Sequence, residues 1–493
     1  MESNIIPILI FIFWFFHIQQ RFFYYLYFWQ VKTYCLDRFF EEIKRNKNIV
    51  FPKICTPVLI LLFLLYLSVS NVLTSYLLAI FYLILGSYSF LLFLTKKWRF
   101  PVFTKKMIVI FAFGFFIWAF LSFYFWREIV FFILFFELLL PILVFLCVES
   151  VEVPAGLLRR YFMLKAEKKR EKFKDLIVIG ITGSYGKSST KEFLYTILAE
   201  KYKKDKILKT EGNINTEIGV ANTVLKRLNE DHRFFICEMG AYKRGEIKLS
   251  CDIVKPKIGI LTGINEQHLD LFGSQENIVK GKYELIESLP SDGKAFFNAK
   301  NEHCRNLYQK TGIPKFLYGE DAAFPGGENI LGAMAVAKEL GMNEEEILRA
   351  CGKIENKFPG IKIRKGISGL NIIDATYSAN PDGVLAHLEY LKGLFGKKVI
   401  IMPCLIELGE ASAEVHRKIG KKIGEICDLA IIITKDRFKE IKEGAGEKAL
   451  FMENPKEIFE KIKSFCQPGD VILLESRVPS QLINSLVRYG EAK

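Results

Sequence analysis

The 493-residue sequence lacks the cysteine spacing that a disulfide scaffold or a zinc ribbon requires. Its ten cysteines are spread irregularly from Cys35 to Cys466, and no two of them form a Cys-x-x-Cys pair. Irregular spacing in a long chain indicates reduced thiols, on the cytoplasmic side of a membrane or within lipid. The low hydrophobicity of a disordered chain is also absent, because 51% of the residues are apolar.

A basic stretch ahead of the first apolar segment is missing as well, so we do not expect a cleaved signal peptide. Five apolar segments precede residue 150, near Ile5–Trp29, Ile54–Val69, Tyr76–Leu94, Met107–Phe125 and Ile129–Val148. Crossing the hydrocarbon takes about 20 apolar residues. We therefore predict a membrane domain over residues 1–155 with about five transmembrane helices. The second segment is short, and His17–Arg21 interrupts the first, which predicts a kink or an interfacial position there.

Charge is distributed unevenly between the loops of this domain. Basic residues follow the first segment (Lys32, Arg38, Lys44, Arg45, Lys47, Lys53) and the third (Lys96, Lys97, Arg99, Lys105, Lys106), whereas the other loops carry few charges. Basic loops stay in the cytoplasm. The N-terminus is therefore expected outside. An odd number of spans then places the remainder of the chain in the cytoplasm, bound to the plasma membrane as a multi-pass protein.

Two charged features accompany the predicted spans. Glu137 is the one acid within them, and an acid in this setting either serves a function or pairs between helices. Residues 156–175 combine eight lysines and arginines with Leu157, Leu158, Tyr161, Phe162 and Phe173. This pattern is typical of a basic amphipathic linker on the anionic inner leaflet, or of a solvated helix. The net charge of +14 fits membrane flanks and phosphate substrates.

A strand, a glycine loop and a helix follow from residue 176. Leu176–Thr182 is an apolar run typical of a buried strand, and Thr190–Lys203 has a helical pattern. Between them stand Gly183, Ser184, Tyr185, Gly186, Lys187, Ser188 and Ser189. In such a loop, backbone N–H groups bind phosphates, the lysine neutralises the β/γ charge and the hydroxyl binds Mg²⁺. The sequence therefore predicts an ATP site, although Ile181 stands where the GxxxxGK[ST] pattern has glycine.

The shorter GxxGK[ST] spacing resembles that of the Mur ligase family, and further segments resemble its motifs in order. They are Thr210–Gly219 (TxGNxNxxIG), Glu238–Ile247 (EMG…GEI), His268–Gly273 (HL..FG), Lys282–Glu284 (AKxE), Asn298–Ala299 (NADN), Asp374–Pro381 (DDSYNANP) and Glu407–His416 (ELGE…H). The resemblance covers about residues 176–480. The first of these motifs and the last two favour the MurF type, which adds D-alanyl-D-alanine to cell-wall precursors.

The resemblance implies roles for the matching positions. The nucleotide contacts are Gly183–Ser189, Asn298, Asn329 and Asp374, and the metal contacts are Ser188, Glu238, His268 and Lys282. The substrate contacts are Asn213, Asn215, Thr216, Asn380 and Glu407. The catalytic residues are Lys187, His268 and Lys282. It further implies ATP and two Mg²⁺ ions, with Lys282 carbamylated to bridge to the second. Independently of the family, an acid and a histidine at the ends of neighbouring parallel strands converge at one sheet edge, where ligands bind.

Some positions depart from the family pattern. Gly263 replaces an asparagine, Glu328 a histidine, Lys300 the acid of NADN, and Ala375 the second acid of DDSYNANP. Leu474–Arg477 reads Leu-Glu-Ser-Arg where Lys-Gly-Ser-Arg is common, on the side of the incoming amine. The UDP-sugar-binding domain that precedes the ATP domain in the MurF type is replaced by the apolar segments. The carboxyl substrate therefore stays open between a UDP-linked and a lipid-linked precursor.

The predicted fold is an α-helical membrane domain followed by two α/β domains. Residues 176–360 form a P-loop-type central ATP domain with a parallel sheet, and residues 361–493 form another α/β unit. The resemblance implies that this C-terminal domain is Rossmann-like. The predicted function is an ATP-dependent amide ligase of cell-wall precursor synthesis, acting on a carboxylate and on an amino acid or dipeptide, without nucleic acid. Two alternatives remain: a membrane-bound ligase resembling poly-γ-glutamate synthase, and a P-loop ATP-driven transporter.

Overall fold

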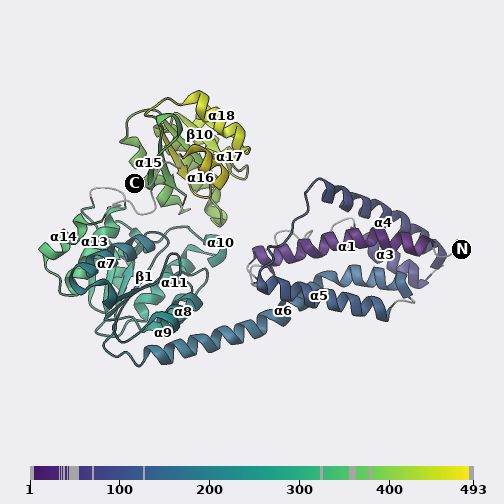
Figure 1. Cartoon of the computed structure of the whole chain (residues 1–493), viewed down its shortest axis with the longest axis horizontal. Helices are drawn as coiled ribbons and strands as arrows, with labels where there is room; N and C mark the ends of the chain where they lie inside the picture. Colours follow the sequence, from purple (N-terminus) through teal and green to yellow (C-terminus); the bar gives the residue numbers. More distant parts are fainter. Residues whose placement is uncertain are drawn as a thin grey trace. The chain divides into compact units, whose positions relative to one another are not determined.

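The computed structural model describes residues 5–32, 34, 36, 39–40, 43, 55–68, 71–125, 128–322, 326–354, 362–376 and 380–487. The chain divides into two compact units, Met1–Arg160 and Tyr161–Lys493. Five long helices coincide with the five apolar segments: α1 (Ile5–Val31), α3 (Cys55–Ser68), α4 (Asn71–Leu94), α5 (Lys105–Tyr124) and α6 (Ile129–Arg170). Figure 1 shows them as the purple-to-blue bundle near the N-terminus.

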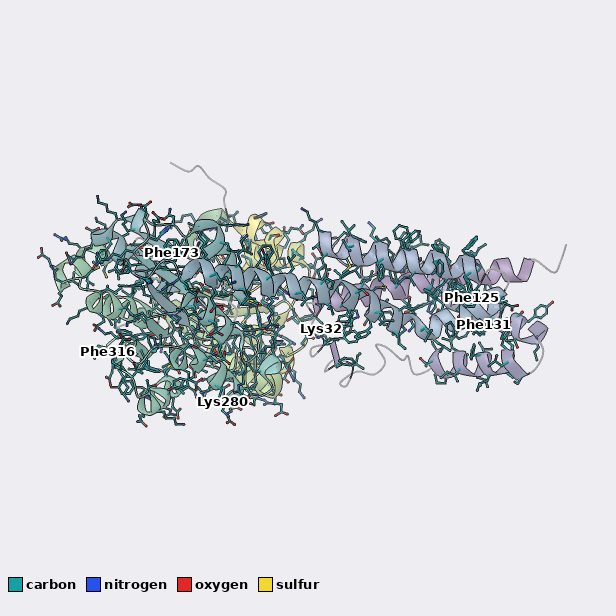
Figure 2. All side chains as sticks on the ribbon, turned by 90° about the horizontal axis from the view of Figure 1, so that it is seen from below. Lys32, Phe125, Phe131, Phe173, Lys280 and Phe316 are labelled. Atoms are coloured by element: carbon teal, nitrogen blue, oxygen red, sulfur yellow. The ribbon has the colours of Figure 1, made fainter. Side chains whose placement is uncertain are left out.

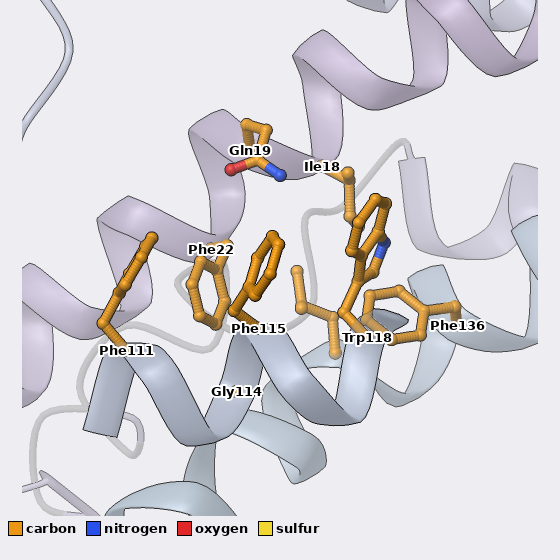
Figure 3. Close-up of a pocket in the computed structure, with 9 residues that line it drawn as sticks. Ile18, Gln19, Phe22, Phe111, Gly114, Phe115, Trp118 and Phe136 are labelled. Carbon is orange, nitrogen blue, oxygen red and sulfur yellow. The ribbon is translucent and has the colours of Figure 1, made fainter. Parts of the chain in front are cut away.

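Three helices in the described part of the chain are long and apolar enough to cross a membrane. They are Leu73–Leu94, Lys105–Tyr124 and Val130–Arg170, whereas α3 has 14 residues and falls short of a full span. Phenylalanines cover much of this unit, and the rings of Phe125 and Phe131 lie 5.9 Å apart (Figure 2). An apolar crevice between α1, α5 and α6 is lined mainly by aromatic rings and contains Gln19 as its polar side chain (Figure 3).

A buried polar cluster joins α1 to α6. Arg21 donates a 2.5 Å hydrogen bond from Nη1 to Oε1 of Glu137, and His17 Nε2 lies 3.4 Å from the same oxygen. Nδ1 of His17 lies 3.3 Å from the Ser89 hydroxyl on α4. Glu137 therefore pairs between helices, one of the two interpretations of its sequence. Because this acid faces His17–Arg21, that stretch stays helical and α1 continues without interruption from Ile5 to Val31.

Helix α6 continues through the predicted linker instead of ending before it. Its last turns pack on the second unit: Ala166 is buried in that core, and Arg170 donates to the carbonyl oxygens of Val254, Phe173 and Leu176. Earlier on the helix, Leu157, Leu158 and Tyr161 are exposed. The linker is thus helical to Arg170, and its C-terminal part contributes to the core of the second unit.

The central α/β domain is built on a parallel six-stranded sheet of order β2-β3-β1-β4-β5-β6. Its strands are β1 (Ile177–Thr182), β2 (Ile207–Lys209), β3 (Phe234–Glu238), β4 (Ile258–Leu261), β5 (Lys294–Asn298) and β6 (Lys315–Tyr318). One face packs against α7 (Lys187–Tyr202), α13 (Gly327–Glu339) and α14 (Glu344–Gly352). The other packs against α8 (Glu217–Arg227), α9 (Glu246–Val254) and α11 (Gln275–Glu287) (Figure 1).

The C-terminal α/β domain has a second sheet of order β11-β10-β9-β12-β8-β7. The strands are β7 (Lys362–Lys365), β8 (Asn371–Ala375), β9 (Lys398–Met402), β10 (Leu429–Ile432), β11 (Ala449–Phe451) and β12 (Val471–Glu475), and β7 alone pairs antiparallel. Helices α15 (Pro381–Lys392), α16 (Ser412–Ile426) and α17 (Phe438–Ala445) cover one face. Helices α18 (Pro455–Phe465) and α19 (Ser480–Leu486) cover the other.

These elements confirm the predicted fold class: long apolar N-terminal helices followed by two α/β sheets, one parallel and one mixed. The predicted strand Phe234–Glu238 is β3, and Asn298 closes β5 as expected. Some predicted positions lie outside the described residues. These are Arg38, Lys44, Arg45, Lys47 and Lys53 of the basic loop, the domain boundary at residue 360, and Tyr377, Ser378 and Ala379 of the DDSYNANP-like segment.

Candidate active site

The phosphate loop lies between β1 and α7, as its sequence predicts. Gly183 has φ +151° and Gly186 has φ +78°, conformations that side chains rarely adopt. A Cβ on Gly183 would lie 2.2 Å from Oγ1 of Thr262, and one on Gly186 would lie 2.4 Å from Oδ1 of Asn329. Both glycines are therefore required by backbone conformation and by close packing. The N-terminus of α7 follows this loop directly, and the backbone N–H groups of a helix N-terminus bind anions.

Glu238 ends β3 next to this loop and is 1% exposed. Oε2 of Glu238 accepts hydrogen bonds from Ser188 Oγ at 2.9 Å and from Lys191 Nζ at 3.0 Å, and Oε1 accepts one from Asn215 Nδ2 at 3.2 Å. A hydroxyl and a carboxylate side by side at the phosphate loop are the oxygen ligands that Mg²⁺ prefers. Ser188 and Glu238 thus fit a magnesium ion bound beside a nucleotide.

Two further lysines lie in this region. Lys187 Nζ donates to the loop carbonyls of Gly183 at 2.8 Å and Ser184 at 3.1 Å, and burial lowers its pKa. Lys282, on α11, is 2% exposed and its Nζ lies 3.3 Å from the carbonyl oxygen of Ala241. Burial, reinforced by the charge of Lys187, lowers the pKa of Lys282 to about 7. A substantial fraction of Lys282 is therefore a neutral amine near neutral pH.

His268 lies where the central and C-terminal domains touch. Its Nδ1 is 2.5 Å from Oε2 of Glu407, and its ring packs edge-on against Tyr242 at 4.8 Å. His268 (φ +66°) and Glu407 (φ +64°) both occupy the left-handed region, which is costly for side chains of this size. Burial lowers the pKa of His268, although Glu407 opposes this. The pair brings two predicted site residues, 139 positions apart, into direct contact.

A second contact links the same two domains through the phosphate loop. The backbone N–H of Asn265 donates a hydrogen bond to Ser184 Oγ at 3.2 Å. Its side-chain Nδ2 donates to Asp382 Oδ2 at 2.9 Å and lies 3.5 Å from Asn380 Oδ1. Asn380 caps α15 by accepting from the Gly383 N–H at 2.9 Å. The start of α15 is thereby tied to the loop that binds phosphate.

The nucleotide residues expected on other strands surround the loop. The Thr190 hydroxyl lies 3.3 Å from Asn329 Oδ1, and Asn298 Nδ2 donates to the Thr262 carbonyl at 2.7 Å. The Tyr185 ring fills the space where a Cβ on Gly263 would lie, 2.3 Å from Cζ. Gly263 is thus the partner of Tyr185, which gives a physical reason for the missing asparagine.

Two other predicted residues, Asp374 and Thr216, contact neighbours within their own domains. The contacts of Asp374 that the structure gives are to Thr376 and to Arg364 within the C-terminal domain. Thr216 caps α8 by accepting from the Gly219 N–H, and Asn213 is exposed. Within the described residues no group of three or more His, Cys, Asp or Glu side chains is gathered closely enough to hold a metal. Of the four predicted metal ligands, Ser188 and Glu238 are in direct contact.

Three residues of the site were not predicted from the sequence. Lys191 is fully buried and pairs with Glu238, and Asn265 and Asp382 join the two domains. Lys191 stands one turn after Lys187 on α7, the face that turns toward β3. That spacing marks Lys191 as inward-facing. Asn265 and Asp382 are 117 positions apart, and no local pattern connects them.

A strand, a phosphate loop and a helix, with a serine and a carboxylate placed for Mg²⁺, define a nucleotide-dependent enzyme of the P-loop class. Residues 181–344 match the Mur ligase middle domain, and residues 361–477 match the Mur ligase glutamate ligase domain. The chain belongs to the Mur ligase family. Its members are ATP-dependent acid–amino-acid ligases that use Mg²⁺, and in this chain long apolar helices stand in place of the family's N-terminal domain.

Several relatives carry one name, UDP-N-acetylmuramoyl-tripeptide–D-alanyl-D-alanine ligase. That of Synechocystis sp. is 29% identical over 331 residues, which cover 61% of this chain and 71% of the relative. That of Bacillus subtilis is 26% identical over 338 residues, 61% of this chain and 72% of the relative. The structure of MurF from Acinetobacter baumannii superposes with a TM-score of 0.59 at 25% identity, covering 65% of this chain and 78% of that one. MurF from Thermotoga maritima in complex with ADP shares the fold, with a TM-score of 0.56, 23% identity, and coverage of 66% and 83%.

Proposed function

We propose that this chain is a membrane-bound ligase of the MurF type, which adds D-alanyl-D-alanine or a similar amine to a cell-wall precursor. The observation that carries this proposal is the juxtaposition of the loop's Ser188 with Glu238, in a chain whose relatives named above are MurF enzymes. ATP activates the carboxylate of the precursor as an acyl phosphate. The amine then attacks the acyl carbon, an amide bond forms, and inorganic phosphate leaves.

Each residue of the site has a part in this reaction. Lys187 and the loop N–H groups hold the β- and γ-phosphates. Ser188 and Glu238 would hold Mg²⁺, which would supply positive charge to neutralise the phosphates. Asn298, Asn329 and Asp374 complete the nucleotide contacts. Asn213, Asn215, Thr216, Asn380 and Glu407 serve the substrates.

Lys282 is suited to become a carbamate. Carbamylation requires a neutral amine to attack CO₂, and the pKa of Lys282 is lowered to about 7 by burial. The product is an anion within a region that contains Lys187. We propose that this carbamate and His268 would hold a second Mg²⁺, which would supply further positive charge to the acyl phosphate.

The helical unit anchors the enzyme, with the ligase domains in the cytoplasm. The support is the charge of the loops after the first and third apolar segments, together with three helices of membrane-spanning length. The exposed Leu157, Leu158 and Tyr161 beside Arg159 and Arg160 suit contact with an anionic inner leaflet. In this arrangement the precursor is presented at the membrane surface, linked to lipid in place of UDP.

The experiment compares two precursors as carboxylate donors. Detergent-purified full-length protein is given ATP, Mg²⁺ and D-alanyl-D-alanine with either a UDP-linked tripeptide or a polyprenyl-linked tripeptide, and the amide product is measured by mass spectrometry. Product from the lipid-linked donor at the higher rate supports the proposal in full. Product from the UDP-linked donor alone supports the ligase and contradicts the lipid-linked substrate. No product from either donor with D-alanyl-D-alanine contradicts the MurF assignment. Product with L-glutamate or D-glutamate in its place favours the ligase that resembles poly-γ-glutamate synthase.

A further inference from the structure

A buried carboxylate ends β12 on the side of the sheet that carries α15. Glu475 is 1% exposed, and its Oε2 lies 2.6 Å from Nδ1 of His387 on α15. Leu473 packs in the core beneath α15, and Glu475, two residues further along the strand, points to the same face. Burial raises the pKa of Glu475, and the imidazole opposes this. An acid and an imidazole are therefore held in contact at the carboxyl edge of the C-terminal sheet.

Directly opposite Glu475 on the neighbouring strand stands Ala375. The register of β12 and β8 pairs Glu475 with Ala375, and the Ser476 N–H donates to the Ala375 carbonyl at 3.3 Å. Ala375 is fully buried in the core beneath α15, so its methyl group faces the same helix as the Glu475 carboxylate. A side chain as small as alanine leaves room at this edge for the longer glutamate beside it.

The two positions depart from the family pattern in opposite directions. Ala375 stands where the DDSYNANP segment has its second acid, and Glu475 stands where the Lys-Gly-Ser-Arg segment has glycine. One strand has lost a carboxylate, and its register partner has gained one. We infer that Glu475, on β12, supplies the carboxylate that the motif carries on β8. Together with His387 it forms a positioning pair for the part of the site that binds the incoming amine.

The pair positions α15 in a defined way. A carboxylate that accepts from Nδ1–H fixes the tautomer of an imidazole and leaves its Nε2 lone pair free to accept. The same helix begins at Asn380 and Asp382, which contact Asn265 beside the phosphate loop. His387 is thereby anchored to the sheet at Glu475, while the start of its helix is anchored to the ATP domain. Loss of the carboxylate shifts α15 relative to the sheet edge on which the incoming amine is held.

The test is a relocation of the carboxylate in full-length, detergent-purified protein. Glu475→Ala is compared with the double variant Ala375→Asp/Glu475→Ala, which places the acid where the motif has it. Glu389→Gln, on the exposed side of α15 where Glu389 pairs with Lys422, is the control. The readouts are amine-dependent ADP release, with KM for the amine and for ATP, and the Nδ1–H signal of His387 in protein labelled with ¹⁵N-histidine.

We expect Glu475→Ala to raise KM for the amine about tenfold, since small displacements of a bound reactant are costly, and to leave KM for ATP unchanged. The double variant should regain most of the loss and the hydrogen-bonded Nδ1–H signal. A double variant no better than Glu475→Ala, or equal losses for amine and ATP, would overturn the inference. Only the kinetic readouts of this inference rest on the proposed ligase function. If the wild-type protein shows no amine-dependent turnover, the proposed function fails, and the Nδ1–H signal alone decides the pair.

Discussion

Lys191 and Glu238 form a buried ion pair, with Nζ 3.0 Å from Oε2, immediately beside Ser188. Neither side chain is more than 2% exposed. A buried carboxylate needs a compensating charge, and Lys191 provides it. The acid expected to bind Mg²⁺ is therefore paired with a lysine from the helix that follows the phosphate loop.

This pair separates the metal role of Glu238 from its structural role. Glu238→Gln should raise the Mg²⁺ concentration needed for half-maximal ADP release at least tenfold. It should also lower stability by up to about 3–5 kcal/mol. Lys191 loses its buried carboxylate and keeps the Gly212 carbonyl at 2.7 Å and the half-exposed Glu192 at 3.8 Å. The double variant Glu238→Gln/Lys191→Met should regain stability in thermal unfolding without regaining Mg²⁺ affinity. His268→Ala should raise the Mg²⁺ requirement too. Unchanged Mg²⁺ titrations in both single variants would return Glu238 and His268 to purely structural roles.

Lys282 is expected to lower the stability of the folded protein near pH 7, because its amine is buried. Its folded pKa is about 7, against about 10.4 for an unfolded lysine, so the unfolded chain binds more protons between these values. The stability that depends on Lys282 should therefore rise as pH increases from about 7 to 10. Lys282→Met removes this dependence and should stabilise the protein at pH 7 by an amount on the order of a few kcal/mol.

The same variant should abolish ligation. Thermal unfolding of the wild type and of Lys282→Met between about pH 7 and 10 measures the change in stability. NMR with ¹³C-bicarbonate detects the carbamate on wild-type protein above pH 7. Lys280→Met, on the exposed side of α11, is the control. A carbamate signal that persists unchanged in Lys282→Met would assign the modification to another lysine.

The polar cluster of the helical unit should be a major source of its stability. Glu137→Ala leaves Arg21 and His17 buried without their acid, a change that costs about 3–5 kcal/mol. The triple variant Glu137→Leu/Arg21→Leu/His17→Leu should recover most of this loss, since apolar side chains replace the whole cluster. Thermal unfolding in detergent measures both. Glu128→Ala, whose partner is the exposed Tyr66 hydroxyl, should change little; a loss equal to that of Glu137→Ala would contradict the prediction.

The loop charges predict the side of the membrane on which the ligase domains lie. A reporter fused after Lys493 should be active only when it is of the cytoplasmic kind. The reason is a group of basic residues: Lys96, Lys97 and Arg99 lie between α4 and α5, and Lys105 and Lys106 begin α5. Basic loops resist translocation. Replacing these five residues by glutamine should increase the fraction of reversed molecules. A periplasmic reporter that is active at the C-terminus of the unaltered chain would overturn the topology.

The sequence predicts those parts of the site in which backbone and side chains act locally. Gly183, Lys187 and Ser188 belong to one loop, and Glu238 ends an apolar run whose strand character is evident, so their grouping follows from chain order at the edge of a parallel sheet. The burial of Lys191 could not be predicted in this way, because a lysine at that spacing is buried only when a carboxylate from another element lies beside it.

Interactions between distant segments were harder to predict. His17–Arg21 interrupts an apolar run and predicts a kink or an interfacial position. The stretch lies within the continuous helix α1, and Arg21 pairs with Glu137, 116 positions further along the chain. The contact of His268 with Glu407 and the register of Glu475 with Ala375 likewise join segments about 100 or more positions apart. Such contacts depend on sheet order and domain packing, which local patterns do not encode.

The central claim is that the phosphate loop drives amide ligation. The most direct measurement is ADP release by full-length protein, in the presence of Mg²⁺, for the wild type, for Lys187→Ala, and for Lys204→Ala as an exposed lysine beyond the same helix. The account predicts release that requires both a carboxylate and an amine donor. Lys187→Ala should lose this release at least 100-fold while keeping its fold, since its Nζ contacts only loop carbonyls, and Lys204→Ala should retain it. ADP release by Lys187→Ala at the wild-type rate, or release by the wild type that is indifferent to both donors, would contradict it.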